Sequence, residues 1–182
     1  MARITPATNP SEKSQALLAE VKKKLGGTPN LFTTLAHSPA ALGFYLAGGG
    51  AIGDAKLSAS LREQLALAIA GANGCDYCAS AHTTIGKMFK LDEAELARNL
   101  NAASSDAKVN AALTFARNVT LTRGRVSDAE LAAVRNAGYS DGEILEIIAV
   151  VAINTFTNYV NHIADTEVDF PLVTTEAASK AA

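Results

Sequence analysis

Residues 58–82 read SASLREQLALAIAGANGCDYCASAH, and this stretch decides the fold. Its first half is rich in alanine and leucine, and Gly74 interrupts it before a second segment of helix-forming residues. Such a pattern favours one helix that ends at a glycine and a second helix that starts directly after it. We therefore expect an antiparallel helical hairpin, with helices at about 58–72 and 75–90.

The rest of the chain carries the same helical signals. Alanine is the commonest residue and tryptophan is absent. Capping-box patterns, in which Ser or Asp precedes Glu by three positions, mark helix starts. They occur at Ser60 with Glu63, Asp92 with Glu95, Ser127 with Glu130, and Ser140 with Glu143. The sequence therefore predicts an all-α fold with further helices at about 11–25, 39–48, 93–100, 105–122, 128–137 and 141–164. We expect a short helical piece after Pro29 and a flexible turn at Gly48-Gly49-Gly50.

Length and composition predict a single compact domain over residues 1–182. The chain has 182 residues, of which 48% are hydrophobic, enough for one core and too few for two. Residues 165–182 begin with Val168-Asp169-Phe170-Pro171 and then become polar, which predicts a C-terminal arm that packs against the domain before it frays.

An offset of 80 residues aligns the thiol-bearing segment with the last predicted helix. It places Ser60, Glu63, Leu65, Ala72 and His82 on Ser140, Glu143, Leu145, Ala152 and His162. This similarity suggests a duplicated helical-hairpin core, in which Thr155 and Asn158 replace the two cysteines. Any thiol chemistry would then belong to the first copy.

Charge and hydropathy exclude several classes of partner. The net charge is −2 and no basic stripe is present, so we expect no nucleic acid and no anionic membrane as partner. The longest apolar run, 147–153, is far shorter than the roughly 20 residues of a membrane span. The first ten residues lack the apolar core of a signal peptide, so we expect a cytoplasmic protein, where a structural disulfide is rare.

The two cysteines are expected to lie in the first turn of the helix after Gly74. Unpaired backbone N–H groups and the helix dipole favour the thiolate there. Cys75 and Cys78 are neighbours at i and i+3, and His82 lies beside Cys78 at i+4. In the antiparallel hairpin, Glu63 lies within one helical turn of His82. This set supplies a nucleophile, a base and a group that orients the base.

The pattern Glu63-x₁₁-Cys75-x₂-Cys78-x₃-His82 resembles the motif of the alkyl hydroperoxidase D (AhpD-like) group in the carboxymuconolactone decarboxylase-like superfamily. The resemblance extends from about Pro29 to Pro171 and is closest to the peroxidase-related branch. It implies an all-helical fold with a duplicated core, assembly into trimers or hexamers, and reduction of peroxides by a cysteine pair.

By this resemblance, Cys78 corresponds to the peroxidatic cysteine, Cys75 to the resolving cysteine, and His82 with Glu63 to the proton relay. The position before the second cysteine is a histidine in the best-known members and is Tyr77 here. Tyrosine, with a pKa of about 10, can donate a hydrogen bond but is a poor base at neutral pH, and Tyr77 is included among the candidate catalytic residues. The expected substrate is an organic hydroperoxide or hydrogen peroxide. Because the chain has no third cysteine, an external dithiol, either thioredoxin-like or lipoyl-bearing, must reduce the disulfide.

Other interpretations of the same residues stay open. Cys75, Cys78 and His82 could bind zinc, although a closed zinc site usually has a second cysteine pair, so we expect no metal and no other cofactor. Glu63 could serve only the capping box with Ser60. The whole protein could be a general disulfide reductase, a carboxymuconolactone decarboxylase-type enzyme or a non-catalytic oligomeric binding module.

Several polar residues outside the motif are assigned structural roles. His162 has no neighbouring nucleophile, so we expect a hydrogen-bonded structural histidine, and His37 is expected to serve the turn before Pro39. Asn154, Asn158 and Asn161 could line a pocket or satisfy backbone groups at an oligomer interface.

Overall fold

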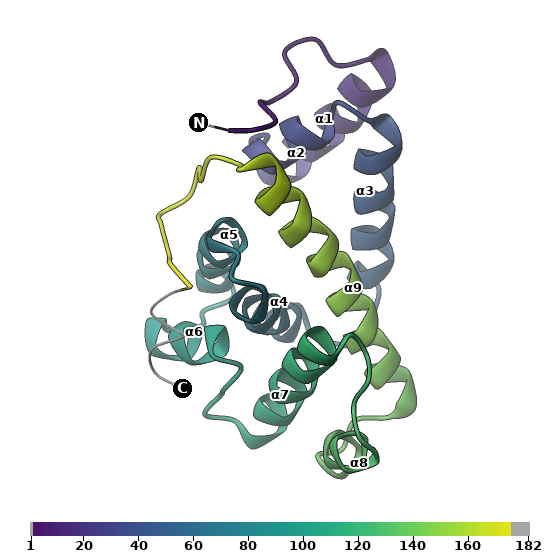
Figure 1. The fold of residues 1–182 in the computed structure, drawn as a ribbon, viewed down its shortest axis with the longest axis vertical. Helices are drawn as coiled ribbons and strands as arrows, with labels where there is room; N and C mark the ends of the chain where they lie inside the picture. The colour runs from purple at the N-terminus through teal and green to yellow at the C-terminus, as the bar shows by residue number, and fades with distance from the viewer. Residues whose placement is uncertain (1, 176–182) are drawn as a thin grey trace.

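The computed structural model describes residues 2–175, and this part of the chain is helical without β-strands (Figure 1). The predicted all-α fold is confirmed. The helices are α1 (Glu12–Leu25), α2 (Asn30–Leu35), α3 (Pro39–Gly53), α4 (Ala59–Asn73), α5 (Asp76–Met88), α6 (Glu93–Leu100), α7 (Ala107–Thr122), α8 (Asp128–Asn136) and α9 (Asp141–Ala164).

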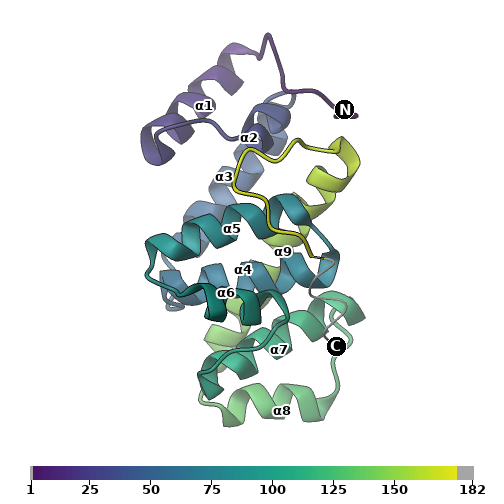
Figure 2. The same ribbon diagram turned by 90° about the vertical axis from the view of Figure 1, so that its left-hand side faces the viewer.

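Helix α4 lies at the centre and packs against α5, α6, α7 and α9 (Figure 1). Helices α1 to α3 lie at one end of the molecule and α8 lies at the other (Figure 2). Leu65, Leu67 and Ile69 of α4 are fully buried although they point in different directions around the helix. A helix that is apolar on all sides is stable only when other helices surround it, and α4 satisfies this condition.

Most predicted helix starts are confirmed, and one is wrong. Ser127 and Ser140 each form the complete capping box with the glutamate three residues later. The N-cap of α4, however, is Ser58, whose Oγ accepts a hydrogen bond from the backbone N–H of Leu61 at 3.1 Å. Glu63 therefore lies outside the cap, and its carboxylate is free to reach another helix.

The turn between α4 and α5 depends on glycine. Gly74 ends α4 with φ of 69°, in the left-handed region where a side chain is unfavourable. Gly71, one turn earlier, lies against the backbone of α6, where a Cβ atom would overlap the carbonyl oxygen of Leu100. Gly74 thus sets the hairpin turn, and Gly71 lets α4 and α6 approach closely.

The predicted flexible turn at Gly48-Gly49-Gly50 is wrong, because α3 continues through these residues to Gly53. Gly48 lies directly against α9, where an added Cβ would come 2.8 Å from Cδ1 of Ile153. Packing against α9 therefore compensates for the low helix propensity of the three glycines.

The 80-residue offset relates a hairpin to an uninterrupted helix. Residues 60–82 span α4, the turn at Gly74 and α5, whereas residues 140–162 belong to α9 and its N-cap. Asn154, the counterpart of Gly74, donates from Nδ2 to the Val150 carbonyl inside α9 at 2.9 Å. The two segments therefore have identical residues at several aligned positions, but only the first contains a turn between two helices.

Helix α9 is the only helix among residues 2–175 that is long and apolar enough to cross a membrane by length and composition. Its most apolar window has a mean hydropathy of 1.3, and 39% of that window is buried inside the fold. Because α9 packs against α4, α7 and α3, it is a core helix of this helical domain.

The segment after α9 crosses over α5, as the predicted arm required (Figure 2). The backbone N–H of Val173 donates to Oγ of Ser80 at 2.9 Å, and that of Thr175 donates to Oδ1 of Asp76 at 2.7 Å. The rest of the predicted arm, residues 176–182, lies outside the described residues. The described part fixes the outer face of the first turns of α5.

Candidate active site

The hairpin of α4 and α5 brings Glu63 and His82 together. Nδ1 of His82 lies 2.7 Å from Oε2 of Glu63, and the two side chains are 17% and 18% exposed. The contact that the turn geometry predicted is present. With Ser58 as the helix cap, the alternative that Glu63 is a capping residue is excluded.

Both cysteines lie at the start of α5, as predicted. Cys75 is the N-cap and Cys78 belongs to the first turn. Both are free thiols, with residue exposures of 1% and 3%. Any substrate must therefore be small, or the surrounding side chains must move when it enters. The more exposed His82 and Glu63 mark the side of the site nearest to solvent.

The environment separates the acidities of the two thiols. The hydrogen bond from Cys75, supported by His82 and by the amides of Asn161 and Asn158, outweighs burial and lowers the pKa of Cys78 to about 6. The same hydrogen bond, together with burial, raises the pKa of Cys75. At neutral pH, Cys78 is therefore the thiolate and Cys75 is the thiol.

His82 is biased towards its protonated form. Burial alone favours the neutral imidazole, but the carboxylate of Glu63 and the negative charge of Cys78 outweigh it and raise the pKa of His82. The ring can therefore hold a proton close to a thiolate, which is the arrangement of a general acid.

Helix α9 supplies residues whose place in the site the sequence analysis did not decide. Nδ2 of Asn161 donates a hydrogen bond to Sγ of Cys78 at 3.2 Å, and Oδ1 of Asn158 accepts one from Nδ2 of Asn73 at 2.8 Å. The spacing of Asn154, Asn158 and Asn161 places them on one face of the helix. That spacing was the available signal, but it does not show which helix the face meets.

Tyr45 of α3 was missed altogether. Burial and the negative charges of Cys78 and Glu63 raise the pKa of Tyr45, so its hydroxyl stays protonated near both groups. Its ring packs against Phe32, with 5.5 Å between the centroids. No local pattern distinguishes this tyrosine from an ordinary core aromatic residue.

The hydroxyl and ring of Tyr77 have partners outside the Cys78–His82–Glu63 set. Its hydroxyl accepts a hydrogen bond from the backbone N–H of Leu31 at 3.0 Å, and its ring meets that of Phe170 edge to face. Burial and the neighbouring Asp169 raise the pKa of Tyr77. Its observed contacts thus join α5 to α2 and to the C-terminal segment.

The remaining histidines have backbone partners. Nε2 of His162 lies 3.2 Å from the Gly74 carbonyl oxygen, which confirms the predicted structural role. Nε2 of His37 lies 2.9 Å from the Thr5 carbonyl oxygen and so ties the end of α2 to the N-terminal segment. Among residues 2–175, the His, Cys, Asp and Glu side chains form no group of three or more that could hold a metal ion.

Comparison with known proteins gives a family match over part of the chain and a shared fold. Residues 39–122, which include both cysteines, His82 and Glu63, match the carboxymuconolactone decarboxylase family. No protein of curated function matches the sequence significantly.

Three solved structures share the fold over most of the chain. A peroxidase-related protein with an AhpD core from Ralstonia eutropha JMP134 is 25% identical, covering 91% of this chain and 93% of its own, with a TM-score of 0.81. A peroxidase-related protein from Silicibacter sp. TM1040 is 23% identical, with coverages of 91% and 92% and a TM-score of 0.79. The debrominase Bmp8, solved as a cysteine-to-alanine variant with 2,3,4-tribromopyrrole, is 20% identical, with coverages of 98% and 96% and a TM-score of 0.78.

Proposed function

We propose, from the premise that the chain is an AhpD-like member of the carboxymuconolactone decarboxylase superfamily, that it is a thiol-dependent peroxidase. Its substrate is an organic hydroperoxide or hydrogen peroxide. The observation that carries this proposal is the pair of free thiols at the start of α5, with His82 of the same helix held 2.7 Å from Glu63. The lowered pKa of Cys78 agrees with it.

The reaction proceeds in two steps that use residues of this chain. The Cys78 thiolate attacks the terminal oxygen of the hydroperoxide, the O–O bond breaks, and His82 protonates the alkoxide that leaves as an alcohol. Cys75 then attacks the sulfenic acid of Cys78, which forms a disulfide and releases water. Glu63 holds the ring of His82 in place and stabilises its charged form.

A dithiol partner completes the cycle. The chain has two cysteines, so the disulfide is reduced by exchange with a thioredoxin-like or lipoyl-bearing protein. A cytoplasmic location, where such reductants work, is part of the proposal.

We also propose that the protein is a homo-oligomer, a trimer or hexamer, which buries an apolar face of α3 and α9. Large apolar side chains are 39% to 67% exposed on these two helices. They are Phe44, Leu145, Ile148, Tyr159 and Ile163. Large apolar side chains exposed together on one part of a surface are typical of an interaction site. Equilibrium sedimentation tests the assembly, and a monomer at micromolar concentration would contradict it.

The redox proposal is tested by titrating free thiols after adding tert-butyl hydroperoxide to the reduced protein. We expect both thiols to disappear and an intramolecular disulfide to form. Cys75→Ser should stop at a sulfenic acid on Cys78, which dimedone traps, and Cys78→Ser should not react. Two unreacted thiols in the wild type, or full turnover in Cys78→Ser, would overturn the proposal.

Further assays on the same variants separate the alternative functions. A general disulfide reductase would oxidise its thiols with a small disulfide and not with the hydroperoxide. A decarboxylase of the superfamily type would keep its activity on a lactone substrate when both cysteines are serine. A non-catalytic binding module can also contain buried thiols. In that case both thiols would be unreactive towards iodoacetamide at neutral pH.

A further inference from the structure

Two asparagines of α9 lie close to the reactive sulfur of Cys78. Nδ2 of Asn161 donates to Sγ of Cys78 at 3.2 Å. Asn158 lies one turn earlier, and its Oδ1 is held by Nδ2 of Asn73 at 2.8 Å. This hydrogen bond fixes the amide plane of Asn158, whose NH₂ group lies close enough to lower the pKa of Cys78.

Each asparagine retains one polar atom without a partner. Asn158 is 0% exposed and Asn161 is 4% exposed, yet Nδ2 of Asn158 and Oδ1 of Asn161 have no hydrogen-bond partner among the described residues. Buried polar atoms are nearly always paired, so a vacant donor and a vacant acceptor beside one nucleophile require an explanation. A group that binds there only during turnover provides one.

We propose that Asn158 and Asn161 form the binding site for the oxygen atom that passes from the hydroperoxide to Cys78. In this site Asn161 holds the sulfur, Nδ2 of Asn158 donates to the transferred oxygen, and Oδ1 of Asn161 accepts the hydroxyl proton of that oxygen. The inference rests on the proposed peroxidase function and adds two catalytic residues to it.

The chemistry shows which step each amide serves. In the first step an S–O bond forms and the O–O bond breaks, and the electron pair leaves on the alkoxide, which takes the proton of His82. The transferred oxygen keeps its hydrogen and becomes the sulfenic hydroxyl. In the second step Cys75 gives up its thiol proton, the S–S bond forms and the S–O bond breaks, and that same oxygen leaves with the electron pair and takes up that proton to become water.

Negative charge therefore develops on the transferred oxygen in the second step and not in the first. A preorganised donor aimed at such an oxygen acts as an oxyanion hole, and removal of one donor of this kind costs about 10²-fold to 10³-fold in rate. Asn158 should consequently act mainly on disulfide formation. Asn161, which contacts the sulfur itself, should act mainly on ionisation of Cys78 and hence on the first step.

The test is rapid mixing of reduced protein with tert-butyl hydroperoxide, followed by dimedone trapping and thiol titration at set times. In Asn158→Leu, of nearly equal size, we expect the sulfenic acid to accumulate and the disulfide to form about 10²-fold more slowly. In Asn161→Ala we expect a higher pKa of Cys78 and slower formation of the sulfenic acid.

Asn118→Leu is the matched control. Nδ2 of Asn118 donates to Oε1 of Glu130 at 2.6 Å, between α7 and α8, so this variant loses an asparagine hydrogen bond outside the site. It should react like the wild type. Thermal unfolding and circular dichroism identify any variant that fails to fold, and Asn158→Ala then replaces Asn158→Leu.

The outcomes separate the inference from the function on which it rests. Wild-type thiols that do not react with the hydroperoxide would overturn both. A reactive wild type together with folded Asn158 and Asn161 variants of unchanged kinetics would overturn only the asparagine site. Equal slowing of both steps in Asn158→Leu would also contradict it, because Asn158 acts mainly on the second step.

Discussion

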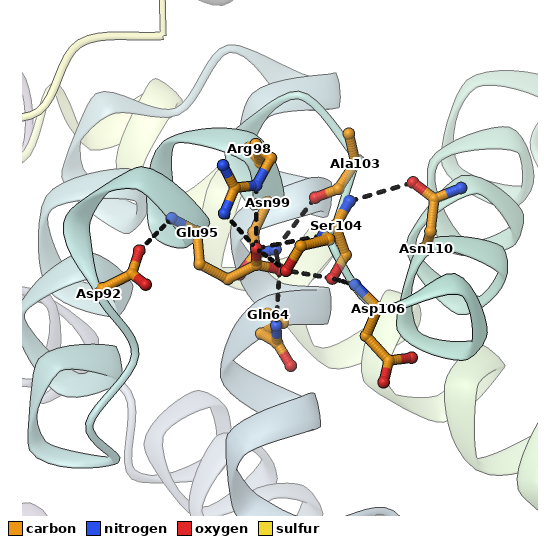
Figure 3. Close-up of polar contacts among 10 residues, drawn as sticks. Gln64, Asp92, Glu95, Arg98, Asn99, Ala103, Ser104, Asp106 and Asn110 are labelled. Atoms are coloured by element: carbon orange, nitrogen blue, oxygen red, sulfur yellow. Dashed lines mark hydrogen bonds and ion pairs between the residues drawn. The ribbon is translucent and has the colours of Figure 1, made fainter.

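Two buried polar clusters contact the neighbouring residues Gln64 and Glu63 of α4, and they differ in how completely their atoms are paired. One surrounds Glu95 at the start of α6 (Figure 3). The other surrounds Cys78. Oε1 of Glu95 accepts hydrogen bonds from Asn99 at 3.0 Å and also from Gln64 and Ser104, and Oε2 accepts from Arg98 at 2.9 Å and from the hydroxyl of Ser105 at 2.9 Å.

We call the Glu95 cluster closed because both oxygens of its carboxylate are paired, and the Cys78 cluster open because a hydrogen-bond donor beside the sulfur is unpaired. Both carboxylate oxygens of Glu95 carry several donors, and although burial opposes ionisation, these donors lower the pKa of Glu95 to about 2. The atom left over in this cluster is an acceptor, Oδ1 of Asn99. Beside Cys78 a donor is left over as well. The comparison teaches that a carboxylate with both oxygens paired stabilises a fold, while an unpaired donor beside a nucleophile suits a reaction.

The largest effect should come from breaking the closed cluster. Glu95→Ala leaves the buried donors of Asn99, Gln64 and Ser104 without their acceptor, and loss of such a network should cost about 2–4 kcal/mol of unfolding free energy. Urea denaturation measures it. The pKa of Cys78 should be unchanged, and the rate with hydroperoxide should stay within about twofold of the wild type.

The control for this prediction is Glu93→Ala on the same helix. Glu93 is exposed and pairs with Lys87 at the surface at 2.7 Å, so its removal should leave the unfolding free energy nearly unchanged. Equal destabilisation by the two variants would show that the Glu95 cluster has no special role.

The pH dependence of unfolding distinguishes the clusters by the pH range in which each loses its stabilisation. The folded protein holds the pKa of Glu95 at about 2, below the unfolded value of about 4.3, so this carboxylate stabilises the fold fully above about pH 5. That contribution, about 3 kcal/mol, is lost as the pH falls through 4 towards 2. Glu95→Gln should remove this part of the acid dependence, as measured by urea denaturation between pH 5 and pH 2.

The open cluster titrates at higher pH. The pKa of Cys78 is lowered to about 6 from an unfolded value of about 8.5, so thiolate stabilisation is present above about pH 8.5 and is lost as the pH falls through 6. Thiolate absorbance in the ultraviolet should show a midpoint near pH 6. Cys75→Ala removes the hydrogen bond that contributes most and should raise that midpoint by at least about one unit. An unchanged midpoint would mean that Cys75 does not set the acidity of Cys78.

The sequence predicted the helices and the hairpin because both depend on local signals. Gly74 with the segments on either side specified a turn, and the turn fixed the register that places Glu63 opposite His82. Local signals failed where packing between distant helices decides. The glycines at 48–50 favour a turn by propensity, yet the contact of Gly48 with Ile153 holds them in α3.

The site was predictable only in the part that the hairpin contributes. The thiols, His82 and Glu63 lie within one stretch of sequence, so helical spacing relates them. Asn161 and Tyr45 come from α9 and α3, and their approach to Cys78 depends on how these helices cross α4 and α5. No local pattern in a single sequence shows how the helices cross. The role of Asn161 therefore stayed undecided, and Tyr45 could not be told from a core aromatic residue.

The smallest effects on stability should come from two neighbouring residues of α4 that belong to different clusters. Glu63 contacts His82, whereas Gln64 donates from Nε2 to Oε1 of Glu95 at 3.4 Å. Glu63→Gln keeps the size of the side chain and removes the charge that favours the imidazolium. We expect hydroperoxide turnover to fall by about tenfold to a hundredfold, with little change in Tm.

Gln64→Ala should have the opposite profile. Glu95 keeps its other donors, so loss of this long hydrogen bond should cost about 1 kcal/mol or less and leave turnover unchanged. Steady-state turnover and the unfolding free energy, measured on both variants, show whether each residue affects the reaction or the stability. If Gln64→Ala slowed turnover as much as Glu63→Gln, the two clusters would be coupled through α4, and the separation between a stabilising cluster and a reactive cluster would fail.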